Sequence, residues 1–371
     1  MDIAIITTRL VDYDAIGNFT MASAAAFSSQ GKVAVYTFAY ERPAIDRVMV
    51  RFLGGRNGHS MGTNLRSFIN TRTLARELSK FDALLVVNPD IGSIMAYHLA
   101  KRYNPRLKVI WRFHGATPPE FLSTARDRIL MRVRNMAYKW SMRRSDLVLT
   151  DSEYIRGELI KTGVDQSMVS AARLGVDIDR FSRGNGRKIR DRFGIGDKFT
   201  ILYVGRLVNF KHVDELIRAV SGVDGIFLLI AGGGPESQSL QKLCSDLGIA
   251  DRVRLAGRVP DQELPEYYAA CDAWVTASSH EGFCVPIIEA MAAGKPVIVP
   301  RVTAMPETAG DGGLTYRKGD VEDLDNKLGL LMGDKGLYRD MANKALKRAA
   351  GFEMRHVLES YIKDIADIVN N

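Results

Sequence analysis

The sequence contains little cysteine and lacks any long apolar run. Its three cysteines, Cys244, Cys271 and Cys284, form neither a CxxC nor a Cys/His spacing, which argues against a disulfide framework and a structural zinc site. No apolar segment reaches the roughly 18 to 20 residues that a membrane-spanning helix needs. The first residues, MDIAIITTRL, do not follow the basic and then apolar layout of a signal peptide. We therefore expect a reduced, cytoplasmic chain.

What the sequence does contain fits a soluble protein of two domains. The chain has 371 residues, of which 46% are hydrophobic and 25% charged, and this length allows two domains of ordinary size. The basic excess is confined to one half. Residues 1–176 hold 25 Lys and Arg against 15 Asp and Glu, whereas residues 177–371 hold 26 against 28. This asymmetry indicates an anionic partner for the first half, be it nucleic acid, a membrane surface or an acidic substrate.

Short β-branched runs alternate with helix-like segments in both halves. Strands that read as continuous apolar runs indicate parallel sheets covered on both faces, so we expect two doubly wound α/β domains. The runs are DIAIITT, VAVYTFA, ALLVVN, KVIWRFH and LVLTDS in the first half, and FTILYVG, IFLLIAGGG, RVRLAG, AWVTAS and KPVIVP in the second.

A polar segment rich in Gly and Arg separates the two halves. We place the hinge near residues 176–195, within RLGVDIDRFSRGNGRKIRDRFGI and before the new strand FTILYVG. At the other end of the chain, Val357, Tyr361, Ile365 and Ile368 stand at helical spacing, which predicts an amphipathic terminal helix.

The stretch HEGFCVPIIEAMAAGKPVIVP, residues 280–300, has the most distinctive pattern. It predicts a turn after the strand AWVTASS and then a helix that starts near Pro286 and stops at Gly294. Free amides at a helix N-terminus, beyond the carboxyl end of a parallel strand, favour an anion such as phosphate.

Two carboxylates flank this expected anion site. Glu281 precedes the helix and Glu289 lies about one turn into it, so the two side chains can face different parts of one extended ligand, one acid for each sugar ring with the anion between them. The alternative interpretation is that Glu281 caps the helix and Glu289 is an ordinary solvated residue.

These motifs together resemble the retaining glycosyltransferases of family 4 (glycosyl transferases group 1). EGFCVPIIEAMAAGKPVI is similar to the E-x7-E signature of that family, and the likeness continues in VGRLVNFKHVDELIRAV, IAGGGPESQSLQKL, RVRLAGRVPDQELPEYYAACDAWVTAS and RLGVDIDRF. It is strong over residues 170–320 and weak in the first half. The resemblance implies the GT-B fold, with two Rossmann-like doubly wound domains that face a central cleft.

The resemblance also implies domain roles. Residues 1–176 would form the acceptor-binding domain, joined by the C-terminal helix 354–371, and residues 177–353 would bind the nucleotide-sugar donor. Arg206 and Lys211 would clamp the donor diphosphate as a leaving group. The other donor contacts implied are the ribose (Glu289), the donor sugar and phosphate (Glu281, Gly282, Phe283, Cys284, Val285) and the base (Arg258, Val259).

Two residues of the first half complete the implied site. Gly17 stands where the family has a glycine-rich turn near the diphosphate, with Asn18 in place of a second glycine. His114 matches a histidine beside the donor sugar; its alternative is a structural histidine. His212 stands where relatives commonly carry glycine, and we assign it no chemistry.

We expect no metal and no cofactor, since the nucleotide sugar is itself a substrate. Two Asp-x-Asp strings, Asp12 to Asp14 and Asp177 to Asp179, are the alternative metal-binding candidates. The first falls in an early loop and the second on the junction motif.

Residues 126–144 predict a helix with a basic face beside an apolar stripe. Arg128, Arg132, Lys139 and Arg143 share one face. The neighbouring stripe consists of Ile129, Val133, Met136 and Trp140. Such a helix suits an anionic membrane surface and a lipid-linked acceptor, which would make the protein peripheral at the inner face of the cell membrane. The alternative is a helix whose stripe packs into the core.

The resemblance implies transfer of a hexose from UDP-hexose or GDP-mannose, with retention, to a glycan or lipid-linked acceptor in cell-envelope polysaccharide, lipopolysaccharide or glycolipid assembly. The competing interpretation is a sugar-nucleotide epimerase of the same fold. A nucleic-acid-binding protein would rest on charge alone. An NAD-dependent oxidoreductase is disfavoured because AGGGPE lacks the GxGxxG spacing.

Overall fold

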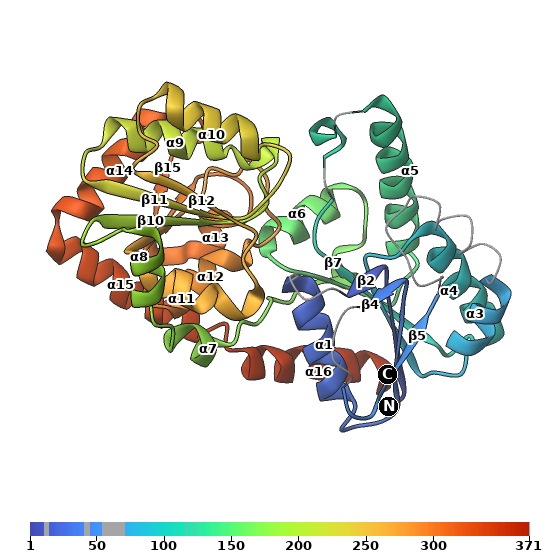
Figure 1. Ribbon diagram of the computed structural model, residues 1–371. Coiled ribbons are helices and arrows are strands. Elements are labelled where there is room, and N and C mark those ends of the chain that lie inside the picture. The colour runs from blue at the N-terminus through green and yellow to red at the C-terminus, as the bar shows by residue number, and fades with distance from the viewer. Residues whose placement is uncertain (11–14, 41–44, 54–70, 117, 123, 371) are drawn as a thin grey trace. The chain divides into compact units, whose positions relative to one another are not determined.

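The computed structural model describes residues 1–371 except 11–14, 41–44, 54–70, 117, 123 and 371 (Figure 1). The chain divides into two compact units. The first comprises Met1–Leu174 with Arg355–Asn371, and the second comprises Gly175–Met354. Within the described ranges, no helix is long and apolar enough to cross a membrane.

The first unit is built on a seven-stranded sheet in which every pairing is parallel. The order β5-β3-β1-β6-β7-β8-β9 reverses direction between β1 and β6, as in a doubly wound fold. Two short strands, β2 (Arg9–Leu10) and β4 (Ala39–Tyr40), form a separate parallel pair. They follow β1 and β3 in the chain. The seven strands are β1 (Ile3–Thr7), β3 (Val33–Thr37), β5 (Val48–Phe52), β6 (Ala83–Val87), β7 (Lys108–Phe113), β8 (Leu147–Thr150) and β9 (Val169–Ala171).

Helices connect these strands, and the caps at their ends are visible in the sequence. Asp90 caps α4 by accepting a hydrogen bond from the amide of Ser93, and Ser152 caps α6 in the same way from Ile155. The helices of this unit are α1 (Ala15–Phe27), α3 (Thr71–Leu78), α4 (Ile91–Tyr103), α5 (Ala125–Met142) and α6 (Glu153–Lys161), with short 3-10 turns η1 (Pro119–Phe121) and η2 (Gln166–Met168).

The expected terminal helix is present as α16 (Met354–Asn370), and from Arg355 onward it belongs to the first unit. Tyr361 and Ile365 are its buried residues. The Tyr361 ring lies edge-on to Phe19 of α1, with 5.2 Å between ring centroids, and contacts Phe27 at 6.3 Å. The last residues of the chain thus complete the core of the domain that the first residues begin.

The second unit has a six-stranded parallel sheet in the order β12-β11-β10-β13-β14-β15. Chain order runs outward from β10 to β12 on one side and from β13 to β15 on the other. The point of reversal therefore lies between β10 and β13. The strands are β10 (Phe199–Val204), β11 (Ile226–Ala231), β12 (Val253–Gly257), β13 (Ala273–Val275), β14 (Val297–Pro300) and β15 (Gly313–Tyr316).

Helices cover both faces of this sheet, with α9, α10 and α14 on one face and α11, α12 and α15 on the other (Figure 1). One core cluster consists of strand side chains and the apolar stripes of α9, α10 and α14, with Met341 of α15. The helices are α7 (Ile178–Ser182), α8 (Arg187–Phe193), α9 (Val213–Gly222), α10 (Ser237–Asp246), α11 (Leu264–Ala270), α12 (Val285–Ala292), α13 (Met305–Ala309), α14 (Val321–Gly333) and α15 (Lys335–Ala350), with 3-10 turns η3 (Asn209–Lys211), η4 (Asp261–Glu263) and η5 (Gly310–Gly312).

Candidate functional site

The candidate site lies where the strand order of the second unit reverses, between β10 and β13. The loops that leave adjacent strands β10 and β13 run to opposite sides of the sheet, and ligands of open α/β sheets bind in the opening between such loops. The loop after β10 carries Arg206 and Lys211, and the loop after β13 carries Glu281. Residues 70 or more positions apart in the sequence thus come to one edge of the sheet.

Close packing of backbone fixes the first of these loops. The backbone at Gly232 and Gly234 lies so near the first loop that a Cβ at Gly232 would stand 1.8 Å from the carbonyl oxygen of Gly205, and one at Gly234 2.2 Å from that of Leu207. Only glycine allows this approach. The buried Tyr203 hydroxyl donates a hydrogen bond of 3.1 Å to the carbonyl of Arg206. Arg206 itself is exposed at the rim of a rigid turn.

Lys211 and Glu281 form an ion pair between their Nζ and Oε1 atoms, and each side chain is only 15% exposed. The backbone holds the pair together, because the carbonyl of Phe210 accepts hydrogen bonds from the amide of Ser279 at 2.8 Å and from its hydroxyl at 3.0 Å. The Phe210 ring lies 5.4 Å from Lys211 Nζ and 6.0 Å from the guanidinium carbon of Arg206. Both cations predicted to clamp a diphosphate therefore flank one aromatic ring.

The backbone conformation of His212, the residue after Lys211, is one that glycine adopts most easily. Its φ of 48° lies in the left-handed region, which strains residues that carry a Cβ. Its Nδ1 lies 3.4 Å from Glu215 Oε1, and Lys318 Nζ lies 2.6 Å from the same oxygen. These contacts with Glu215 accompany the strained backbone that starts α9.

The loop after β13 ends in the expected helix. Cys284 occupies the N-cap position of α12 with φ 69°, and Pro286 lies in the first turn. The carbonyl of Phe283 accepts a hydrogen bond of 2.7 Å from the Thr308 hydroxyl. Gly282 and Val285 lie on either side of this turn, so the backbone predicted to hold the donor sugar and phosphate is the N-terminal turn of a helix.

Glu289 lies one turn into α12, partly buried, and does not behave as an ordinary surface residue. Its Oε2 accepts a 2.6 Å hydrogen bond from the fully buried Tyr268 hydroxyl. Burial raises the pKa of Glu289 to about 7, aided by the charge of Asp261 and opposed by the Tyr268 hydrogen bond and by Arg180. A carboxylate with this environment is poised to change charge near neutral pH, and Tyr268 was not identified from the sequence.

Asp177 and Asp179 have structural roles. Asp177 caps α7 by accepting a 2.9 Å hydrogen bond from the amide of Arg180, and Asp179 pairs with Arg183 on the exposed surface at 3.1 Å. Asp12 and Asp14 lie outside the described residues. In the part of the chain that the structure describes, no group of three or more His, Cys, Asp or Glu side chains could hold a metal ion.

The residues expected near the base follow β12 directly. Gly257 ends this strand with φ 72°, Arg258 is exposed, and Val259 is partly buried. The turn lies near the glycine loop, because a Cβ at Gly233 would stand 4.0 Å from the amide nitrogen of Arg258. The base contacts predicted for these two residues thus start from a neighbouring strand end of the same sheet.

In the first unit, His114 follows β7, and its buried side chain is hydrogen-bonded to Asp151, with 2.7 Å between Nδ1 and Oδ2. Gly17 differs from the expectation of a glycine-rich turn. It is buried within the first turn of α1, where a helical backbone replaces the open loop, and Asn18 continues that helix.

The predicted basic helix is α5, and its apolar stripe does not pack into the core. Arg128, Arg132 and Lys139 are exposed as predicted. Arg143 is exposed as well, but it is the C-cap residue of α5 and its side chain donates a hydrogen bond to the carbonyl of Thr162 after α6. It ties two helices together and is a weaker candidate for a surface contact.

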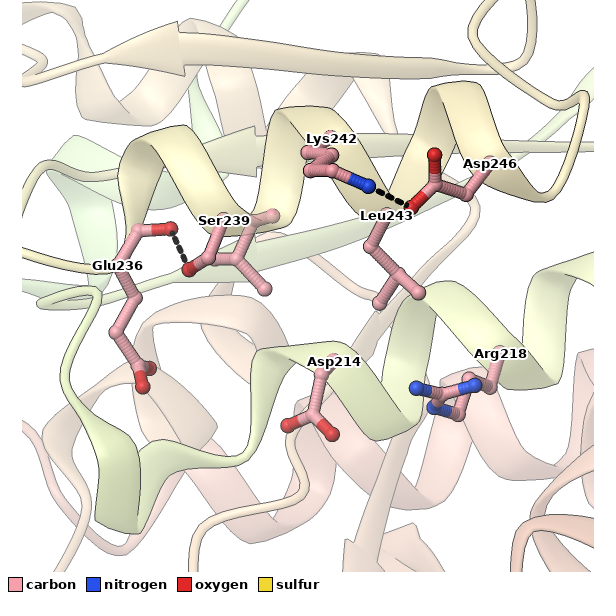
Figure 2. Close-up of a pocket in the computed structure, with 8 residues that line it drawn as sticks. Asp214, Arg218, Glu236, Ser239, Lys242, Leu243 and Asp246 are labelled. Atoms are coloured by element: carbon pink, nitrogen blue, oxygen red, sulfur yellow. Dashed lines mark hydrogen bonds and ion pairs between the residues drawn. The ribbon is translucent and has the colours of Figure 1, made fainter.

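A pocket of about 290 Å³ lies elsewhere in the second unit, between α9 and α10 (Figure 2). Charged side chains of both signs line it, among them Asp214, Arg218 and Glu236, and Lys242 pairs with Asp246 at 2.6 Å. The lining shares no residue with the predicted donor site. This pocket lies between two helices of one face, and its Glu236 end adjoins the loop after β10, because the amide of Glu236 donates a 3.2 Å hydrogen bond to the carbonyl of Leu207.

Two doubly wound parallel sheets in one chain, with cations and carboxylates at the strand reversal of the second, define a protein of the GT-B class. Residues 16–180 match the family model "Glycosyltransferase Family 4", and residues 186–348 match "Glycosyl transferases group 1". The chain belongs to this family of glycosyltransferases.

Two curated relatives illustrate the sequence similarity. The chain is 32% identical over 205 residues to the GDP-mannose-dependent alpha-(1-6)-phosphatidylinositol monomannoside mannosyltransferase of Mycolicibacterium smegmatis, covering 51% of this chain and 54% of that protein. It is 34% identical over 215 residues to the D-inositol 3-phosphate glycosyltransferase of Mycobacteroides abscessus, covering 55% and 48%. The chain thus spans about half the length of the curated relatives it matches.

Solved structures share the fold over the whole chain. The HepE protein (Alr3699) of Anabaena in complex with UDP superposes with a TM-score of 0.80 at 19% identity, covering 99% of this chain and 100% of that one. At this identity the likeness concerns the fold alone.

Proposed function

We propose that this protein is a retaining hexosyltransferase that uses a nucleotide diphosphate sugar, UDP-hexose or GDP-mannose, and needs no metal ion. The observation that carries the proposal is the Lys211 and Glu281 ion pair at the strand reversal, beside the N-terminal turn of α12 and near Arg206. Two cations and a helix N-terminus supply positive charge where the donor diphosphate would leave.

The reaction proposed is transfer with same-face attack. The bond between the anomeric carbon and the diphosphate oxygen breaks, and the acceptor oxygen forms a bond to that carbon on the same face. The acceptor proton passes to the departing phosphate oxygen, so that the products are a glycoside and a nucleoside diphosphate. Arg206 and Lys211 stabilise the negative charge that develops on the leaving group, and Glu289 holds the ribose hydroxyls.

The names of the relatives support a sugar donor of this kind. The mycobacterial relative is described as GDP-mannose-dependent and acts on a phosphatidylinositol monomannoside, whereas the HepE structure contains UDP. We propose either base for this chain, with a glycan or lipid-linked hydroxyl as the acceptor in cell-envelope assembly.

Thermal unfolding with a panel of nucleotides tests the donor site. We expect UDP or GDP at about 100 times its dissociation constant to stabilise the chain by about 2.7 kcal/mol, which corresponds to a rise in Tm of several degrees. The rise should persist in EDTA. NAD is the control that should leave the Tm unchanged.

Each outcome of this experiment has a definite meaning. Stabilisation by neither UDP nor GDP would contradict the proposed donor site, and stabilisation that EDTA abolishes would contradict metal independence. Release of nucleoside diphosphate with formation of a glycoside, measured by chromatography, distinguishes a transferase from an epimerase, which would return an isomerised nucleotide sugar.

The exposed face of α5 supports a peripheral membrane position for the acceptor side. Its exposed large apolar side chains are Ile129, Leu130, Val133, Met136 and Trp140, which are 46% to 70% exposed. The buried residues of α5 all lie near its C-terminal end, and Figure 1 shows the helix extending away from the strands of this unit.

The charges beside this apolar face select an anionic lipid surface. Arg128, Arg132 and Lys139 are exposed on the same helix, and each basic residue near an anionic leaflet contributes about 1 kcal/mol of attraction. An apolar stripe flanked by cations inserts its side chains between headgroups while the cations meet phosphates.

Sedimentation with phosphatidylglycerol vesicles checks this surface. We expect the protein to bind at low salt, and the double variant Val133→Asp, Met136→Asp to bind at least about tenfold more weakly, because it places two charges in the buried apolar layer. High salt or neutral phosphatidylcholine vesicles should also weaken binding.

Leu330→Asp is the matched control, because Leu330 is 47% exposed on α14 of the second unit. This variant should bind vesicles as the unmodified protein does. Failure of the unmodified protein to bind anionic vesicles at low salt would rule out the membrane role of α5.

A further inference from the structure

A buried triad of polar side chains lies at the carboxyl ends of two neighbouring strands of the first unit. Phe113 at the end of β7 pairs in register with Thr150 at the end of β8. The next residue on each strand is His114 on one side and Asp151 on the other. Arg112 belongs to β7 and precedes His114 by two residues, so its side chain leaves the same face of the sheet.

One carboxylate joins the other two groups. Asp151 Oδ2 lies 2.7 Å from His114 Nδ1, and Asp151 Oδ1 lies 2.7 Å from Arg112 Nη2. The three side chains are 1%, 3% and 7% exposed for Arg112, Asp151 and His114. Burial alone would raise the pKa of Asp151, but the charges of His114 and Arg112 and their hydrogen bonds hold it below its usual value. Asp151 is therefore an ionised acceptor.

Two aromatic rings, one from α1 and one from the C-terminal helix α16, lie beside the arginine of this triad. The guanidinium carbon of Arg112 lies 5.0 Å from the centroid of the Phe19 ring and 5.2 Å from that of Tyr361. Aromatic faces stabilise a buried cation that can make few hydrogen bonds. Arg112 thus stays charged beside Asp151 and keeps the carboxylate available to His114.

The contact with Asp151 determines which nitrogen of the His114 ring carries a hydrogen. An ionised carboxylate can only accept, so Nδ1 must carry the hydrogen in this contact. The other ring nitrogen, Nε2, is buried and meets no hydrogen-bond partner among the residues that the structure describes. In the neutral ring this nitrogen has a lone pair, and a buried polar atom without a partner is rarely left so unless a ligand supplies one.

We propose that Asp151, held by Arg112, is a positioning residue that keeps His114 in the Nδ1–H tautomer, so that Nε2 accepts a hydrogen bond from a hydroxyl group of a sugar substrate. This inference rests on the proposed function, because that function supplies the hydroxyl. The hydroxyl of the bound sugar then gives the buried Nε2 a hydrogen-bond partner. In the other neutral tautomer Nε2 would carry the hydrogen and could not accept this hydrogen bond.

The tautomer can be measured directly. In ¹⁵N-histidine NMR of the full chain, with His114 assigned by comparison with His114→Gln, we expect a protonated Nδ1 and an unprotonated Nε2. Asp151→Asn should shift the ring toward a mixture of tautomers, since an amide can donate as well as accept. A wild-type ring protonated at Nε2 and not at Nδ1 would overturn the proposal.

Kinetics tests the consequence for substrate. We expect Asp151→Asn to lower kcat/KM by roughly tenfold to a hundredfold, as much as is lost when the hydrogen-bond partner of a metal-bound histidine is removed. In a His114→Ala background the same change should have no further effect, because Asp151 acts through the histidine. An equal loss in both backgrounds would assign Asp151 a merely structural role and contradict the inference.

Two further variants separate misfolding from misplacement. Asp151→Asn leaves Arg112 buried without its counter-ion, so the double variant Arg112→Met, Asp151→Asn removes both charges and should fold if the single variant does not. Asp146→Asn is the structural control, because Asp146 pairs with Lys101 at 2.5 Å in the same unit. It should keep kcat/KM.

The results distinguish this inference from the proposed function. If His114→Ala leaves transfer unchanged, the substrate role of His114 fails and so does the proposal. If the chain transfers no sugar at all, the proposed function fails, while the NMR tautomer still decides whether Asp151 sets the ring.

Discussion

Replacing Lys211 with alanine is expected to lower turnover by about a hundredfold to a thousandfold, the loss typical when one group that stabilises developing negative charge is removed. The side chain is 15% exposed and pairs with Glu281 at the N-terminal side of α12. Without it, Arg206 and the helix turn remain to balance the leaving diphosphate. Steady-state transfer assays with saturating donor measure the effect.

Glu281, the ion-pair partner of Lys211, allows a second variant that separates donor binding from turnover. In Lys211→Ala, the Glu281 carboxylate loses its counter-ion at the place where the diphosphate must bind, so donor affinity should fall as well as turnover. Adding Glu281→Gln removes that repulsion. We expect the double variant to regain nucleotide affinity, measured by calorimetry, without regaining turnover.

Lys242→Ala is the matched control. Lys242 lies in the same unit, is 75% exposed, and pairs with Asp246 beside the pocket of Figure 2. This variant should keep normal turnover, since an exposed ion pair contributes little and touches no proposed donor contact. Normal turnover in Lys211→Ala itself, with an unchanged circular dichroism spectrum, would refute the role assigned to that lysine.

Much of the fold could be predicted because each apolar run is a local signal. All ten runs quoted from the sequence are strands of the two parallel sheets. The strands not predicted carry weaker signals. β5 alternates between exposed and partly buried residues at the edge of its sheet, and β9 and β15 are short, with few fully buried residues. Edge strands bury less apolar surface, so their composition constrains them less.

The site could be predicted only in part, because its motif is local and its contacts are not. The spacing of Glu281 and Glu289 predicted their places around the start of α12, and the structure has them there. The Lys211 contact with Glu281 joins residues 70 positions apart, and the Tyr268 contact with Glu289 joins residues 21 apart. No sequence period encodes such pairs.

The position of Asp151 in the sequence contains a signal from which its contact with His114 could have been predicted. It follows the strand run LVLT directly, as His114 follows KVIWRF. Polar residues at the carboxyl ends of adjacent parallel strands meet at one edge of the sheet. The strand order needed to make those two strands neighbours comes only from the three-dimensional structure.

Replacing Glu289 with glutamine is expected to stabilise the protein at pH 8 and weaken nucleotide binding there. Burial raises the pKa of Glu289 from 4.5 to about 7, so the folded state favours the neutral acid. The resulting stability is fully present below about pH 4.5 and is lost as pH rises through about 7. The shift corresponds to roughly 3 kcal/mol. Glutamine stays neutral, so the variant should gain up to that amount in free energy of unfolding at pH 8 and little at pH 5.

Nucleotide affinity should change in the opposite direction. The ionised carboxylate accepts hydrogen bonds from ribose hydroxyls, and hydrogen bonds to charged groups contribute about 1.5 to 3 kcal/mol each. We expect about tenfold to a hundredfold weaker binding of UDP or GDP to Glu289→Gln at pH 8, with no decline toward pH 6. The unmodified protein should bind more weakly as pH falls below 7. Urea unfolding and calorimetry at both pH values measure the two effects, with the exposed Asp251→Asn as control.

Tyr268→Phe tests whether the pKa of Glu289 controls nucleotide affinity, because it removes a hydrogen bond to the carboxylate and keeps the carboxylate itself. The Tyr268 hydroxyl donates to Glu289 and opposes the rise in its pKa, so its removal should move the pH at which nucleotide affinity develops upward while leaving the carboxylate in place. Affinity should then recover at higher pH, unlike in Glu289→Gln, where it should stay low at every pH. If Tyr268→Phe lowers affinity equally at all pH values, or if Glu289→Gln unfolds more easily at pH 8, the raised pKa does not govern the site and Glu289 is held by packing alone.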